Sequence, residues 1–478
     1  MVFNSYVFIF VFLPLVLVGY YALNHYGKHK GAQVFLIGMS LVFYGYFNFS
    51  YVFLLAGSIT LNWMIYCRLR RTPRKAVFLL GLVVNLGILG WFKYFDFFVE
   101  NLNALLGTSF LVRGVLLPLG ISFFTFQQIS FLADTYRGEV EECDFLEYAL
   151  FVVFFPQLVA GPIVLHDEMI RQFRNPENRK PEAEWMVKGF QLFTLGLCKK
   201  VLLADVFGPV ADWGFANHAI LDSSHAILTA VLFAFQLYFD FSGYCDMAKG
   251  VGCMLHVTLP TNFDSPYQSA GIMEFWKRWH VTLGRFFTKY VYIPLGGSRR
   301  GRARTCRNAL IVFFLSGLWH GAEWTFVIWG VMHGVGYILD YLGKPLLSRV
   351  PRFLRKGFTF VFVCLAFVAF RAGSVEVMCN MYKAIFGGNW QVPGAFLQTD
   401  ELCLLVRWLN LDRLPGAAHY PMIFYLGLSA YLVFVGKNSV ERVEKGRYGV
   451  CNAVVMGMLF LYCIVSMSGV SIFLYFNF

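Results

Sequence analysis

Long apolar segments, separated by short polar and basic stretches, run through almost the whole chain. They lie near residues 5–24, 32–48, 50–66, 76–97, 115–133, 146–165, 186–209, 226–250, 308–319, 324–342, 357–372, 421–436 and 450–476. A helix of about 20 residues crosses a hydrocarbon core of about 30 Å. The residue-by-residue alternation of a transmembrane strand is absent. The pattern therefore predicts an all-α polytopic integral membrane protein.

Composition supports the same class. Hydrophobic residues make up 58% of the 478 residues and charged residues only 14%, whereas soluble domains carry about 25% charged residues. The longest mixed-polarity stretch, 373–420, is too short for a second domain of ordinary size. We therefore expect one membrane domain over residues 1–478.

The formal net charge of +12 gathers in short loops between apolar segments. The basic clusters lie at 68–75, 171–180, 299–307, 349–356 and 437–447. Such loops favour the cytoplasmic side, so the membrane accounts for the charge and no nucleic-acid partner is expected. The first apolar segment lacks a basic start, and Lys28 and Lys30 follow it. This predicts an uncleaved first span with its amino terminus outside.

The segment 146–165 cannot be a simple crossing. It lies between Arg137 and the cluster 171–180, which both favour the cytoplasm. It also contains Pro156 and the pair Gly161-Pro162, which break helices. We expect a re-entrant hairpin here.

The segment 308–319 raises the same difficulty, because twelve residues form only about 18 Å of helix. We expect it to enter the membrane partway and turn near Gly321, which places His320 at an intramembrane bend. His333 follows thirteen residues later. On one continuous helix the two would differ by about 1300°, or about 220° after whole turns. His320 is therefore the functional candidate, and His333 is expected to be a packing histidine.

Residues 269–297 have the pattern of an interfacial amphipathic helix. One stripe contains Phe275, Trp276, Trp279, Leu283, Phe286 and Phe287, and the other contains Glu274, Lys277, Arg278, Thr282, Arg285 and Lys289. His280 lies on the apolar face, where it either reaches the protein interior or only bonds a carbonyl. Arg278, Arg285 and Lys289 either hold the phosphates of a nucleotide-bearing donor or bind anionic lipid.

A third polar cluster lies in 237–252, where Asp240 and Asp246 flank Ser242 and Tyr244 in an apolar segment. Two carboxylates there require partners, donors or a polar cavity. No histidine stands at ligand spacing, so no metal site is predicted. We expect these four residues to form the polar wall of a tunnel, to which Asn262 adds further polarity.

Three blocks together resemble the membrane-bound O-acyltransferase family. They read FDFSGYCDMAKG, TNFDSPYQSAGIMEFWKRWHVTLGRFFTKYVYIPLGGSRRG and GLWHGAEWTFVIWGVMHG. More narrowly, they are similar to the bacterial branch of the alginate O-acetyltransferase type, which is related to the D-alanyl-lipoteichoic acid transferases. The resemblance implies about 11 transmembrane helices, with re-entrant and interfacial helices, around a central tunnel in the bacterial cytoplasmic (inner) membrane.

The resemblance also implies a site. His320, in L-W-H-G, matches the invariant histidine of the family, and His280, in R-W-H, matches a second catalytic position. Trp279 and Trp319 are then expected to line the tunnel. Moving an acyl group from a thioester to a hydroxyl requires a base, and an imidazole with an ordinary pKa of about 6.5 serves near neutral pH. His320 is expected to be that base, and His280 to polarise the thioester or orient the acceptor; an acetyl-histidine relay stays open.

The implied function is O-acetylation of a cell-envelope or secreted polysaccharide. Acetyl-CoA is the expected donor substrate, no cofactor is expected, and a separate extracytoplasmic acetyltransferase is expected to complete the transfer. Alginate, peptidoglycan, cellulose and other glycans stay open as acceptors, as does acyl transfer to teichoic acid.

Two other classes also stay open. In a transporter, Asp240, Asp246, Lys199 and Lys200 would line a permeation path, although no inverted repeat is visible. In a purely structural scaffold, neither histidine would matter for function.

Overall fold

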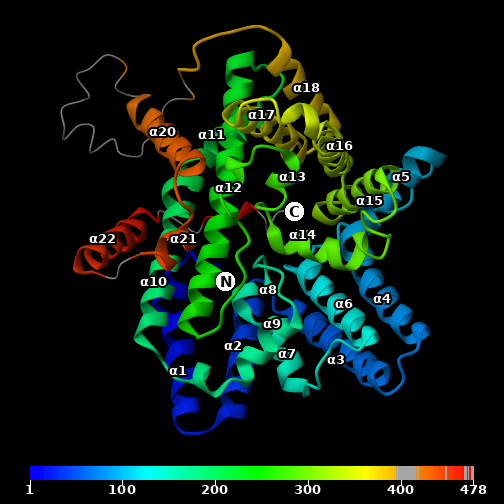
Figure 1. Ribbon diagram of the computed structural model, residues 1–478, viewed down its shortest axis with the longest axis vertical. Coiled ribbons are helices and arrows are strands. Elements are labelled where there is room, and N and C mark those ends of the chain that lie inside the picture. The colour runs from blue at the N-terminus through cyan, green and yellow to red at the C-terminus, as the bar shows by residue number, and fades with distance from the viewer. Residues whose placement is uncertain are drawn as a thin grey trace.

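The protein is a bundle of helices (Figure 1). The computed structural model describes residues 1–394, 396, 416, 419–446, 449–467, 471 and 473–474, and no strand occurs among them. The amino-terminal helices are α1 (Leu13–His25), α2 (His29–Gly45), α3 (Ser50–Arg71), α4 (Lys75–Leu89), α5 (Phe95–Leu106) and α6 (Ile121–Arg137), with π-helical segments η1 (Phe8–Phe12) and η2 (Gly90–Tyr94). The central elements are α7 (Phe145–Val153), α8 (Phe155–Leu158), α9 (His166–Arg174), η3 (Pro176–Arg179), α10 (Ala183–Cys198), η4 (Lys199–Ala204), α11 (Asp205–Ala216), α12 (Ser223–Met254) and η5 (Pro266–Gln268). The remaining elements are α13 (Ile272–Phe275), α14 (Val281–Phe287), η6 (Thr288–Tyr292), α15 (Arg302–His320), α16 (Trp324–Leu347), α17 (Arg352–Arg371), α18 (Val375–Phe386), α20 (Tyr420–Phe434), α21 (Ser439–Glu444) and α22 (Val450–Ser466).

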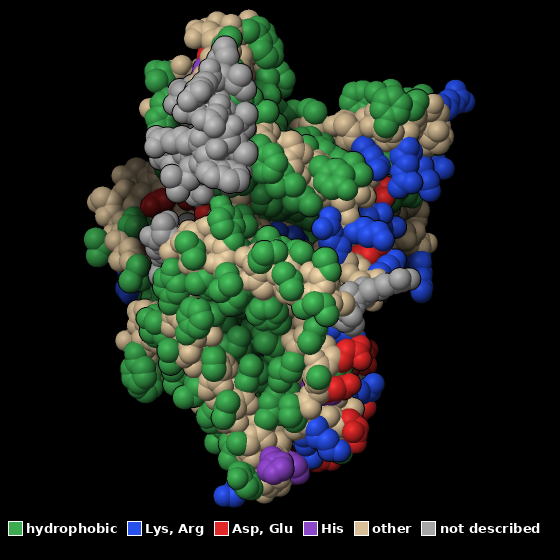
Figure 2. Space-filling view, turned by 90° about the vertical axis from the view of Figure 1, so that its left-hand side faces the viewer, with side chains coloured by type: hydrophobic (Ala, Val, Ile, Leu, Met, Phe, Trp, Pro, Cys, Tyr) green, Lys and Arg blue, Asp and Glu red, His purple; other side chains and the backbone are tan. Residues whose placement is uncertain are grey.

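Several of these helices are suited to cross a membrane. In the described part of the chain, six are long and apolar enough: Phe8–His25, Ser50–Arg71, Lys75–Leu106, Ser223–Met254, Trp324–Leu347 and Arg352–Arg371. Figure 2 shows a broad apolar surface, with charged side chains gathered along one edge. The predicted class of a multi-pass helical membrane protein is confirmed, while the expected number of about 11 crossings is not.

The helix α12 forms the centre of the bundle (Figure 1). In the most apolar 18-residue stretch of α12, 83% of the stretch is buried, whereas the corresponding share in the other candidate spans is 17–44%. It packs closely on α10 through glycines. A Cβ on Gly250 would lie 2.6 Å from the Gly189 carbonyl oxygen, and one on Gly243 would lie 2.8 Å from the Gly196 carbonyl oxygen. Small residues of this kind let membrane helices approach backbone to backbone.

The segment 146–165 is broken where the prolines and glycines predict. Helix α7 has nine residues, of which Tyr148–Val153 are buried, and α8 has only four, all buried. Nine residues span about 14 Å, less than half of a hydrocarbon core. Gly161 lies so close to Gln157 that a side chain would overlap its backbone. The segment therefore does not cross as one helix, as the re-entrant interpretation requires.

The twelve-residue length predicted for the segment 308–319 is wrong, but the predicted end of this helix near Gly321 is confirmed. Helix α15 has 19 residues, about 28 Å, because the basic residues from Arg302 onward continue the helix. It ends at His320, and Gly321 is extended with φ −157°. Helix α16 then packs back on α15. A Cβ on Gly317 would overlap the Phe326 carbonyl, so this crossing also needs a glycine.

The predicted continuous amphipathic helix over 269–297 is also wrong. Helices α13 and α14 are separate and short, and His280 lies between them with φ +46°. Backbone bonds hold this turn: Asp264 N–H donates to the Arg278 carbonyl, and Val281 N–H donates to the Asn262 carbonyl. Five of the six residues of the apolar stripe are nonetheless buried, and Trp276 is partly buried.

Candidate active site

His320 is the last residue of α15, and its imidazole lies among aromatic rings. The ring centroids of Trp319, Trp329 and Phe370 lie 4.9, 5.0 and 5.2 Å from it. The side chain is buried. The Gly321 break thus places an imidazole at the end of a helix inside an apolar bundle, as the sequence predicts.

The fold brings His280 to His320. Their ring centroids are 6.3 Å apart, and both rings line one small cavity. The other residues around this cavity are Leu237, Phe241, Trp279, Trp329, Phe367 and Phe370. His280 therefore lies beside the end of α15, in the left-handed turn between α13 and α14, and not on a continuous amphipathic helix.

Asn262 fixes the orientation of His280. Its Oδ1 accepts hydrogen bonds from the Thr282 backbone N–H at 3.2 Å and the Thr282 hydroxyl at 2.9 Å. A backbone N–H only donates, so the atom facing it must be the amide oxygen. His280 Nδ1, 3.2 Å from that oxygen, must then donate to it. In the neutral ring the basic lone pair is therefore on Nε2.

The same network reaches the re-entrant segment. The Thr282 hydroxyl accepts a hydrogen bond from the Ile163 backbone N–H at 2.9 Å. The chain Ile163–Thr282–Asn262–His280 therefore joins the Gly-Pro turn to the imidazole. Polar networks of this kind hold a catalytic side chain in one rotamer.

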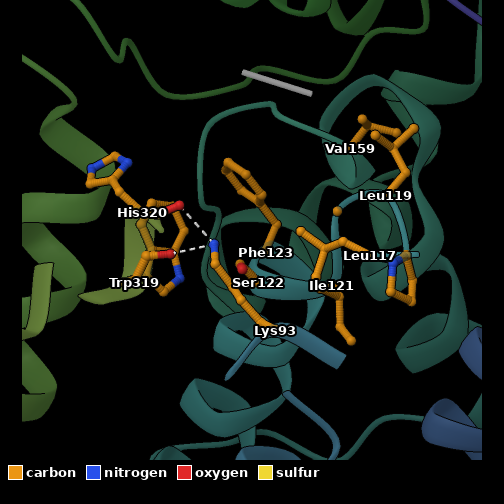
Figure 3. Close-up of a pocket in the computed structure, with 11 residues that line it drawn as sticks. Lys93, Leu117, Leu119, Ile121, Ser122, Phe123, Val159, Trp319 and His320 are labelled. Atoms are coloured by element: carbon orange, nitrogen blue, oxygen red, sulfur yellow. Dashed lines mark hydrogen bonds between the residues drawn. The ribbon is translucent and has the colours of Figure 1, made fainter. Parts of the chain in front are cut away.

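A second cavity lies on the other side of His320 (Figure 3). Its lining includes Lys93, Gly120, Ser122, Trp319 and His320. His320 is the one residue that borders both this cavity and the cavity shared with His280. His320 therefore contributes to the lining of two cavities in the described part of the chain.

Two residues at this helix end were not anticipated from the sequence. Lys93 Nζ donates to the carbonyls of Trp319 and His320 at 2.7 and 2.8 Å. The Tyr94 hydroxyl donates to the Leu318 carbonyl at 2.7 Å. The signal was the lysine itself, an ionisable residue inside the apolar segment 76–97, which marks a functional candidate in a membrane protein.

His333 occupies a different position. It accepts a hydrogen bond at Nδ1 from the Trp276 indole N–H at 3.2 Å, and it lines neither cavity. Trp329 lies between the two histidines of this region, 5.0 Å from each by ring centroids. These contacts agree with the packing role expected for His333.

The predicted orienting residues fall into two groups. Trp279 lines the cavity shared by the two histidines and Trp319 lines the second, while Asn262 holds His280. Asp240, Ser242, Tyr244 and Asp246 are buried but line neither cavity. Their tunnel role stays a prediction.

The two aspartates have lysine partners. Lys200 Nζ lies 2.7 Å from Asp240 and 2.9 Å from Asp205, and Lys199 Nζ lies 2.6 Å from Asp246. These five residues belong to α12, η4 and the start of α11. The pairing offsets the cost of burying the carboxylates and links these elements.

The three cations proposed for donor phosphates also face carboxylates. Arg285 forms a two-pronged pair with Glu168 at 2.5 and 3.0 Å. Lys289 lies 3.0 Å from Asp134 and 2.9 Å from Glu139. Arg278 lies 3.1 Å from Glu274 and 3.8 Å from Asp264. Phosphate binding by these residues would have to compete with the pairs, and it stays a prediction.

Among the described residues, no group of three or more His, Cys, Asp or Glu side chains is placed to hold an ion. The site consists of imidazoles, indoles, an amide and a lysine cap. Such groups suit proton transfer and orientation in an apolar chamber.

The fold and the site together define a class of protein: a helical membrane bundle with two histidines at one internal cavity. The profile of MBOAT, the membrane-bound O-acyltransferase family, matches residues 10–378. The chain therefore belongs to the membrane-bound O-acyltransferase family and is an O-acyltransferase. This agrees with the enzyme reading and not with a transporter or a structural scaffold.

Relatives of three kinds are similar to the chain. Over 520 aligned residues the chain is 38% identical to the peptidoglycan O-acetyltransferase of Helicobacter pylori, covering 100% of this chain and 98% of the relative. Over 405 residues it is 39% identical to the probable alginate O-acetylase AlgI of Pseudomonas putida, covering 82% of each. Over 234 residues it is 27% identical to the teichoic acid D-alanyltransferase of Streptococcus thermophilus, covering 46% and 56%.

Proposed function

We propose that the protein transfers acetyl groups from cytoplasmic acetyl-CoA toward hydroxyl groups of a cell-envelope polysaccharide. Similarity over the full length to a peptidoglycan O-acetyltransferase favours peptidoglycan as the acceptor polymer. Alginate is the second candidate, because the alginate O-acetylase is equally similar over 82% of the chain. Transfer of D-alanine has weaker support, since that relative aligns with less than half of the chain.

One observation carries the mechanism: two imidazoles face one cavity with ring centroids 6.3 Å apart. In the proposed reaction, His320 accepts the proton of the acceptor hydroxyl as its oxygen attacks the thioester carbon. The new C–O bond forms, the C–S bond breaks, and the thiolate of CoA takes the proton from His320. His280, held by Asn262, orients the reacting groups through Nε2.

The cavity on the far side of His320 supports an exit toward the acceptor. We propose that the protein lies in the bacterial inner membrane with its amino terminus outside, since Lys28 and Lys30 follow the first span. A separate extracytoplasmic acetyltransferase then takes the acetyl group from this first acceptor, frees its hydroxyl again and completes the transfer to the polymer. The basic residues at the start of α15 would lie at the cytoplasmic membrane surface, where anionic lipid is available.

The test uses the purified full-length protein in lipid vesicles with acetyl-CoA, and a thiol reagent that reports free CoA. His320→Ala should abolish CoA release, while the matched variant His333→Ala should retain it per folded molecule. In a deletion strain carrying each variant, base-labile acetate on peptidoglycan should follow the same order. Full polymer acetylation with His320→Ala would refute the assignment of the base. Acetate on alginate instead of peptidoglycan would select the second acceptor.

A further inference from the structure

The end of α15 poses a structural problem that only its neighbour α4–η2 solves. The last carbonyls of a helix have no donor within the helix. At this end Gly321 N–H still bonds the Gly317 carbonyl at 3.3 Å, but the carbonyls of Leu318, Trp319 and His320 extend beyond the helical pattern. In an apolar interior each unbonded carbonyl would be costly.

Lys93 and Tyr94 satisfy all three carbonyls. The Tyr94 hydroxyl donates a hydrogen bond to the Leu318 carbonyl, and Lys93 Nζ donates to the carbonyls of Trp319 and His320. Both residues lie in the π-helical segment η2, which allows two consecutive side chains to reach one target. Short π-helical segments inside α-helices occur frequently at functional sites.

Lys93 is also unusual in its charge. It lies within the candidate span Lys75–Leu106. Among the described residues no carboxylate lies within ion-pair distance of its ammonium, whereas Lys199 and Lys200 both have aspartate partners. Its side-chain nitrogen donates to the Trp319 and His320 carbonyls, at the negative end of the α15 dipole, where a cation is favoured. An ionisable side chain kept in an apolar span for one helix end indicates that the position of that end matters.

We propose that Lys93 and Tyr94 are positioning residues for His320. The imidazole ring of His320 is directed away from the side-chain nitrogen of Lys93 (Figure 3). Lys93 and Tyr94 therefore do not act on substrate through that ring. They fix the two peptide groups from which the imidazole of His320 projects. Loss of the cap lets the helix end fray, and the ring then leaves its place against Trp329 and the cavity shared with His280.

The inference rests on the proposed role of His320 and predicts a specific kinetic pattern. Lys93→Met should lower kcat for CoA release from acetyl-CoA by about 10- to 100-fold, as expected for a displacement of about 1 Å. The KM for acetyl-CoA should change by less than about twofold, because the proposed role of Lys93 involves no contact with acetyl-CoA. Tyr94→Phe, which removes one hydrogen bond, should lower kcat by a smaller factor.

The chain offers a matched control for the tyrosine. The Tyr21 hydroxyl donates to the carbonyl of Met254, the last residue of α12, at 2.8 Å. Tyr21→Phe therefore removes the same kind of bond from a helix end that carries no histidine of the site. It should leave kcat unchanged.

The outcomes separate the two proposals. If His320→Ala is inactive while folded Lys93→Met keeps the wild-type kcat, the positioning role is wrong and the base assignment stands. If His320→Ala is active, the base assignment fails. If Lys93→Met does not accumulate as folded protein, the tyrosine pair decides: equal kcat for Tyr94→Phe and Tyr21→Phe would overturn the inference. A change confined to KM would overturn it as well.

Discussion

Replacing Asn262 with alanine tests how the His280 imidazole is held. The substitution removes one oxygen that accepts from His280 Nδ1–H, the Thr282 backbone N–H and the Thr282 hydroxyl. The Val281 N–H bond to the Asn262 backbone carbonyl is retained. The left-handed turn therefore keeps its main-chain hydrogen bond and loses the hydrogen bonds to the Asn262 side chain.

The cost to stability follows from the donors left behind. The Thr282 N–H is buried and cannot move away from the space that the amide leaves. One unsatisfied buried donor costs about 1–3 kcal/mol. The hydroxyl and the imidazole can rotate to other partners, so we expect a loss of stability near this range rather than three times as much.

The cost to the rate comes from the imidazole. Without Oδ1, neither the ring angle nor the Nδ1–H tautomer is fixed, and Nε2 no longer faces the cavity in every molecule. A displacement of about 1 Å at a reacting group lowers a rate by about 100-fold. We expect CoA release per folded molecule to fall by about 10- to 100-fold.

The assay compares Asn262→Ala with Asn62→Ala. Asn62 is also fully buried, and its amide pairs with that of Asn85 between α3 and α4, away from the histidines. Both variants should melt at lower temperature in detergent, but only Asn262→Ala should lose rate per folded molecule. Wild-type turnover in folded Asn262→Ala, or equal losses in both variants, would refute the argument that this amide orients His280.

Three further predictions concern packing, buried charge and pH. His333→Phe should lower stability by about 1–3 kcal/mol, because the indole N–H of Trp276 loses its acceptor. CoA release per folded molecule should stay near wild type. A loss of turnover would give this histidine a catalytic role. Lys199→Met should destabilise the fold by about 3–5 kcal/mol, because Asp246 is left buried and uncompensated, and adding Asp246→Leu should restore most of the loss; no recovery in the double variant would contradict this. Hydrogen bonds from Arg174 hold the pKa of Glu147 below its usual value, so this pair stabilises the protein above the unfolded pKa and loses that effect as pH falls through the folded pKa. Melting curves from pH 7 to 3 should therefore show a weaker acid dependence for Glu147→Gln, and an unchanged dependence would show that the pair does not couple to folding.

Much of the architecture was predictable because membrane solvation constrains the sequence directly. The proline and glycine breaks in 146–165 and the helix end at His320 are local chain properties, and both are confirmed. Errors arose where polarity was taken as a sign of loop structure. Arginine is a good helix former. The basic residues before residue 308 therefore form the first turns of α15 and not a loop in front of it.

The candidate site was predictable only in part. The two histidines were found through sequence blocks and through the cost of imidazole in an apolar segment. Lys93 and Tyr94 were missed because they lie more than 220 residues before the carbonyls that they bond. The long-range pairs of Asp240 and Asp246 were likewise beyond the reach of spacing arguments.

The sequence alone determined the class of the protein, its helical periodicity, the breaks in its helices and the identity of the two histidines, because these depend on local chemistry and on the solvent that each segment meets. Only the tertiary structure decided that the His280 turn folds inward to within 6.3 Å of the His320 ring, that one amide sets the tautomer of His280, and that a lysine from another helix caps the end of α15. The physical reason is that hydrogen bonds and ring contacts depend on distances between segments far apart in the chain, which no local pattern encodes.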